Sequence, residues 1–101
     1  MNIDGLPGEE LIVAGLTDLR SGRESVQALL VAIGAPRLRT IGLELPDFDL
    51  PDPEHRLYDL LAEDDSDSAH SRYNALIRRL VSFERAAECL QSAQEASARE
   101  K

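Results

Sequence analysis

The last third of the chain carries the strongest hydrophobic pattern, and this pattern predicts one long helix from about Ala69 to Ala98. Apolar residues recur there in alternating steps of four and three, which is the spacing of one helix face. The residues of this face are Ala69, Tyr73, Leu76, Leu80, Phe83, Ala87 and Leu90. A second stripe, on the opposite side, holds only small residues: Ala75, Ser82, Ala86, Cys89, Ala93 and Ala96. Two such faces predict core packing on one side and a partner on the other.

Two shorter helices are predicted near the N-terminus. Pro7, followed by two acidic residues, is typical of a first helical turn, and apolar spacing then continues to about Arg20. Ser21 and Glu24 stand at the spacing of a capping box. This spacing predicts a second helix over about residues 22–33.

Gly34 and Pro36 predict the end of that second helix, because glycine favours a C-cap and proline cannot continue the hydrogen-bond ladder. Pro36 can also open a short third helix over residues 36–41, ended by Gly42.

The segment 43–52 alternates apolar and acidic residues and contains two prolines, so we expect an extended connector that packs its apolar side chains on the helices. Asp52-Pro53 then predicts the start of a further short helix, ending at about Ala62. An acidic loop should follow, with Asp67 or Ser68 as the N-cap of the last helix. Residues 91–101 are polar, so the helix end there is expected to fray or to be covered by another chain.

Size and composition indicate one domain over residues 1–101. A chain of 101 residues supports one modest core, and its apolar residues are mainly aliphatic, which favours packed helices over strands. We therefore expect an all-α fold, a compact bundle of four to five helices with a long C-terminal helix. The chain shows no export signal, no apolar run long enough for a bilayer and a single cysteine, so we expect a cytoplasmic protein.

The net charge of −8 is unevenly distributed. Ten acidic residues and only one arginine lie between Glu44 and Asp67, whereas Arg20–Arg39 and Arg72–Arg85 each hold four arginines and one glutamate. This pattern predicts separate acidic and basic surfaces instead of a uniformly acidic one.

Residues 26–41 loosely resemble the helix-turn-helix pattern of DNA-binding regulators. Gly34 lies near the turn position of that motif, and Arg37 and Arg39 fall on what would be the recognition helix. The resemblance implies a DNA-binding regulator that uses these two arginines. Three features oppose it: Leu30 stands where the motif usually has a small residue, Gly42 ends the recognition helix early, and the pI is acidic, near 4.6.

A third alternative is a metal-dependent enzyme that uses the Asp47–His55 cluster. Asp47-x-Asp49 resembles the opening of a calcium loop, but the later ligand positions of that motif are filled by other residue types. We found no nucleophile, phosphate-loop or cofactor motif, so we expect no catalytic role, metal or cofactor.

The main prediction is a small protein–protein interaction module that forms a homodimer or binds another protein, with no membrane contact. Its predicted partner-binding residues lie on the small-residue stripe of the last helix: Ser82, Ala86, Cys89 and Ala93. Small side chains let two helices approach closely. The acidic region and the arginine-bearing last helix supply complementary charges for such contacts.

Overall fold

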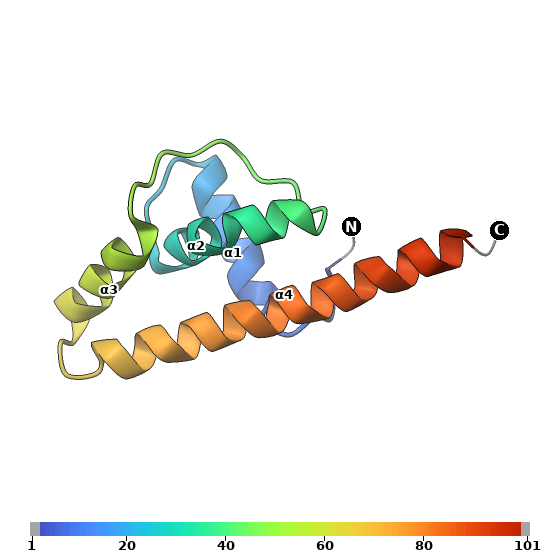
Figure 1. The fold of residues 1–101 in the computed structure, drawn as a ribbon. Helices are drawn as coiled ribbons and strands as arrows, with labels where there is room; N and C mark the ends of the chain where they lie inside the picture. Colours follow the sequence, from blue (N-terminus) through green and yellow to red (C-terminus); the bar gives the residue numbers. More distant parts are fainter. Residues whose placement is uncertain (1–2, 100–101) are drawn as a thin grey trace.

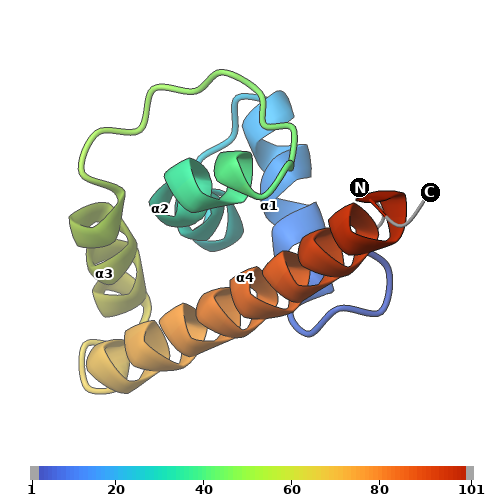
Figure 2. The same cartoon turned by 45° about the vertical axis from the view of Figure 1, so that its right-hand side comes forward.

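The computed structural model describes the backbone of residues 3–99 and the side chains of residues 3–95. Over these residues the fold is all-helical, as predicted, with helices α1 (Glu9–Arg20), α2 (Val26–Thr40), α3 (Pro53–Asp64) and α4 (Ala69–Arg99). The first three helices form a cluster, and α4 passes below it (Figures 1 and 2). The molecule measures 53 × 26 × 20 Å because the C-terminal part of α4 extends beyond that cluster.

The core is centred on α2. Its residues Ala28–Val31 and Leu38 are fully buried, and α1, α3 and α4 all pack against it. The other helices contribute the large buried side chains Ile12, Leu57, Leu61 and Phe83. Each such side chain contributes about 1.5–3 kcal/mol when it leaves water, so this cluster is the main source of stability.

Gly15 fixes the close crossing of α1 and α2. A Cβ atom at Gly15 would lie 2.4 Å from the backbone oxygen of Gln27. The two helix backbones therefore touch at this point, and no other residue type fits there without moving one helix.

The two helices predicted on either side of Gly34–Pro36 are one helix, α2, so that prediction was wrong. Pro36 lies on the exposed side of α2, whereas Gly34, Ala35 and Leu38 are buried. An interior proline costs a helix about 3 kcal/mol. The burial of the residues around it outweighs this cost, and the helix continues to Thr40.

The predicted capping box is also wrong, because Ser25 and not Ser21 caps α2. The Ser25 hydroxyl accepts a hydrogen bond from the Ala28 N–H at 3.0 Å and donates one to an Asp18 carboxylate oxygen at 2.6 Å. Glu24 instead accepts a hydrogen bond from an arginine of α3. Ser25 therefore both starts α2 and ties it to α1.

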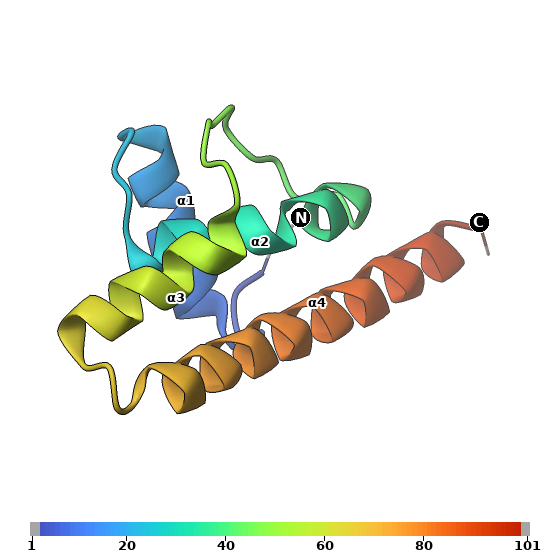
Figure 3. The same ribbon diagram turned by 60° about the vertical axis from the view of Figure 1, so that its left-hand side comes forward.

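The connector 43–52 is extended and passes over the cluster on the side away from α4 (Figures 1 and 3). Leu43, Leu45, Phe48 and Leu50 are half-buried and pack against the core, as predicted. The guanidinium of Arg39 lies 5.5 Å from the centre of the Phe48 ring. The connector is therefore held along its length while its acidic side chains face solvent.

Candidate interaction surface along the last helix

One side of α4 completes the core, as the sequence pattern predicted. Ala69, Leu80, Phe83 and Ala87 are buried, and Tyr73 is half-buried with its ring facing α3. The helix begins at the predicted residue, and it continues through the polar segment to Arg99. Residues 100 and 101 lie outside the described part of the chain.

The small-residue stripe lies on the accessible surface of α4. Ala75, Ser82, Cys89 and Ala93 are exposed, and Ala86 is half-buried. Cys89 is a free thiol. Ala96, the last member of the stripe, lies outside the described side chains. The four predicted partner-binding residues are thus accessible along several turns of one helix.

Four arginines of α4 border this stripe. Arg72 pairs with Asp64 of α3 at 2.7 Å, and Arg79 pairs with Glu10 of α1. Arg78 and Arg85 are exposed and form no ion pair with the other side chains of residues 3–95. The border of the stripe is therefore basic on both sides.

The surface is hollowed beside the N-terminal half of the stripe. A groove of about 460 Å³ separates α4 from α2 and α3, and its lining residues are Val26, Gln27, Leu61, Arg72, Ala75, Leu76 and Arg79. A smaller groove of about 190 Å³ lies toward the start of α1 and is lined by Pro7, Gly8, Arg78, Arg79 and Ser82. Arg79 separates the two grooves, so the concave surface has apolar walls and a basic rim.

Sequence reasoning missed a buried carboxylate where α4 crosses α2. Glu84 is only 5% exposed, and its carboxylate lies 3.8 Å from the Arg37 guanidinium of α2. Arg37 also pairs with Glu88 at 2.7 Å. A Cβ atom at Gly34 would lie 3.2 Å from the Glu84 carboxylate, so the missing side chain there makes room for it. The feature of the sequence that pointed to the burial of Glu84 is its position one helical turn after Leu80 and next to Phe83.

The two acids beside Arg37 have pKa values shifted in opposite directions. Burial raises the pKa of Glu84, and Glu88 raises it further, although Arg37 acts against both. The hydrogen bond from Arg37 lowers the pKa of Glu88. The pair therefore anchors α2 to α4, because the half-buried carboxylate of Glu88 and the buried carboxylate of Glu84 share one arginine.

The two arginines of the DNA-binding alternative are engaged within the chain. Arg37 pairs with the acids of α4, and Arg39 lies against Phe48 of the connector. The turn that a helix-turn-helix requires lies inside the continuous helix α2. The geometry therefore offers this alternative no separate recognition helix.

The acidic segment Asp47–His55 does not converge on a metal-binding geometry. His55 approaches Asp59 at 3.3 Å, but the described residues contain no group of three or more acidic, histidine or cysteine side chains that could hold an ion. The acids of the segment that precede His55 are solvent-exposed.

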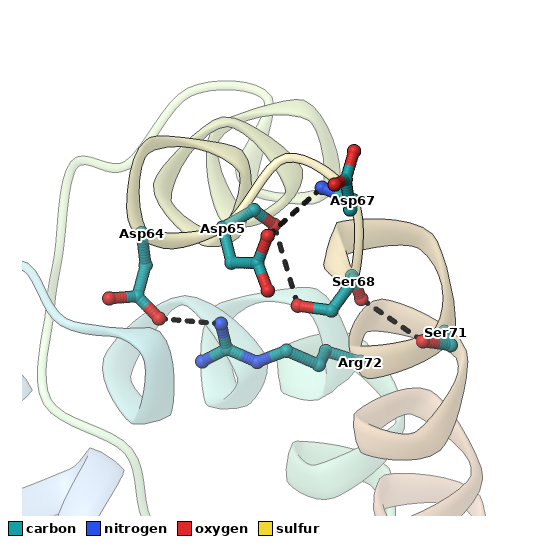
Figure 4. A network of polar contacts seen from close by, with 6 residues as sticks. All are labelled: Asp64, Asp65, Asp67, Ser68, Ser71 and Arg72. Carbon is teal, nitrogen blue, oxygen red and sulfur yellow. Dashed lines mark hydrogen bonds and ion pairs between the residues drawn. The ribbon is translucent and has the colours of Figure 1, made fainter.

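The acidic loop between α3 and α4 is ordered by its own hydrogen bonds (Figure 4). The Asp65 carboxylate accepts from the Asp67 N–H at 3.1 Å, and the Ser68 hydroxyl donates to the Asp65 carbonyl at 3.4 Å. Arg72 reaches back from the first turn of α4 to Asp64. Ser68 directly precedes α4, and its carbonyl accepts the first helical hydrogen bond at 2.9 Å.

Comparison with family models, curated proteins and solved structures found no match to this chain. None of the helices in the described residues is long and apolar enough to span a membrane.

Proposed function

We propose that the chain is a small protein–protein interaction module that self-associates through the exposed side of α4, with a homodimer as the smallest assembly. The observation that supports this proposal is the stripe of small residues between Ala75 and Ala93, which remains accessible while the large residues of α4 fill the core. Small side chains allow the backbone of a partner to approach closely. The stripe is therefore suited to contact with another protein chain.

The length of α4 also supports a role in association. Thirty-one residues of helix extend about 46 Å at 1.5 Å per residue, and the helix projects past the cluster formed by α1–α3. A projecting helix with an unpartnered side gains buried surface only from a second chain. We propose binding to another protein chain as the role of this surface.

Light scattering over a concentration series tests the proposal. We expect the mass to rise above 11.1 kDa with concentration, and we expect Ser82→Trp to weaken association by about tenfold because an indole prevents close approach. Thr17→Trp, at an exposed position of α1, is the matched control and should leave the mass unchanged. A mass of 11.1 kDa at every concentration would refute self-association.

A further inference from the structure

The acidic side chains of the connector form the second notable surface of the molecule. Glu44, Asp47, Asp49 and Asp52 are exposed, and none forms an ion pair with the side chains of residues 3–95. The apolar residues between them pack on the core, so the connector presents its carboxylates outward from a fixed backbone. The connector therefore presents a row of carboxylates to solvent, with Arg20 and Arg23 lining hollows beside it.

The acidic and basic surfaces lie on opposite sides of one molecule. In each of the three ribbon views, α2 lies between the connector on one side and α4 on the other (Figures 1–3). The connector carboxylates therefore cannot reach the arginines that border the stripe of the same chain. They can reach those of another copy.

A symmetric pairing of two α4 helices fits the charges poorly. In a two-fold pairing along the stripe, with the helices either parallel or antiparallel about Arg78 and Arg79, the four arginines of one copy approach the four of the other: Arg72, Arg78, Arg79 and Arg85. Like charges across an interface disfavour association, and salt screening relieves this repulsion.

We propose that the acidic connector of a second copy occupies the exposed side of α4 in a head-to-tail contact. This inference rests on the proposed self-association and names the surface that α4 binds. A ten-residue extended connector spans up to about 33 Å, and the stretch of α4 from Arg72 to Cys89 is about 26 Å long. The connector thus covers both grooves and the small residues, with its carboxylates between the two rows of arginines.

The internal ion pairs of Arg72 and Arg79 are compatible with this contact. Their partner side chains, Asp64 and Glu10, are 72% and 66% exposed, and ion pairs as exposed as these add little stability. Replacing Asp64 or Glu10 with a carboxylate of a second copy therefore costs little free energy. Arg78 and Arg85 bind a second copy without breaking any ion pair.

In a pair of molecules joined head to tail, one acidic connector and one α4 surface remain unoccupied. Such contacts extend into rings or open chains, unlike the closed dimer of a symmetric contact. Masses beyond that of a dimer are therefore expected at high concentration and low salt.

Neutralised variants test the two surfaces separately. In sedimentation velocity at low salt, the basic-surface variant Arg78→Gln/Arg85→Gln and the connector variant Asp47→Asn/Asp49→Asn should each associate at least about tenfold more weakly than the unaltered chain. Arg20→Gln, an exposed arginine of α1, is the control and should not weaken association. Circular dichroism confirms that each variant folds.

Mixing the two neutralised variants gives the decisive result. Each variant keeps the surface that the other lacks, so the mixture should form 1:1 pairs more tightly than either variant associates alone. A mixture that stays monomeric would overturn the head-to-tail contact.

Two other outcomes separate this inference from the proposed function. Self-association that persists in both variants and strengthens with salt would indicate symmetric α4 pairing, which overturns the head-to-tail contact and leaves the proposed function intact. An unaltered chain that remains a monomer at both low and high salt would overturn both.

Discussion

Glu84 is a buried acid next to an arginine at the crossing of α2 and α4. Burial disfavours its charged form, whereas Arg37 favours it. Burial raises its pKa, so the folded chain binds this proton more tightly than the unfolded chain. Its contribution to stability is greatest below the ordinary pKa of 4.5 and falls as pH rises toward the raised pKa. Glu88 behaves in the opposite way, because its pKa is lowered and its contribution falls as pH drops below 4.5.

We predict that Glu84→Gln is more stable than the unaltered chain at pH 7, because the amide resembles the protonated acid that the buried site favours. The difference should shrink as pH falls and disappear below about pH 4.5. Urea unfolding at a series of pH values measures it. Glu88→Gln is the paired control and should be less stable at pH 7, with its difference also shrinking at low pH. A Glu84→Gln difference that does not vary with pH would contradict this account.

The helix α2 is the element on which sequence and structure differ most. Local signals at Gly34 and Pro36 indicate a helix end, yet the helix continues because its buried residues meet three other helices. Proline and glycine act locally, whereas burial depends on residues distant in sequence. For the same reason the ion pairs of Arg37 with α4 could not be foreseen.

We predict that Pro36→Ala stabilises the fold by about 2 kcal/mol. Alanine restores a helical N–H and is favoured over proline by about 3 kcal/mol in a helix interior. The unfolded chain with alanine is more flexible, and this reduces the gain in stability by about 1 kcal/mol. Chemical denaturation gives the free energy of unfolding. Pro51→Ala, at an exposed position of the connector, should bring no gain. An unchanged stability of Pro36→Ala would mean that the helix breaks where the sequence suggested.

The sequence predicted α4 much better than it predicted α2. Its bounds and its core face follow from a long, regular spacing that no glycine or proline interrupts, so the burial of Leu80 and Phe83 could be predicted. The burial of Glu84 was missed, because a single charged residue beside that face is normally exposed. The small-residue stripe was found from spacing alone, but the grooves beside it depend on how α2 and α3 pack against α4.

At the scale of the whole molecule, the acidic and basic segments are separated in space as well as along the sequence. The sequence showed acidic and basic segments, and the structure places the connector and α4 on opposite sides of the cluster. If the acidic connector of one copy contacts the basic border of α4 on another, as proposed, salt weakens that contact. This dependence on salt distinguishes charged contacts from purely apolar ones, which salt does not weaken.

The thiol of Cys89 reports directly on the surface that carries the proposed function. It is exposed in the single chain and lies on the stripe between Ala86 and Ala93. The measurement is its rate of alkylation at low salt, followed by mass spectrometry from dilute to concentrated protein. We predict that the rate falls several-fold as the mass rises above 11.1 kDa, because a partner covers the thiol. An alkylation rate that stays constant while the mass rises would place the interface elsewhere and contradict the account.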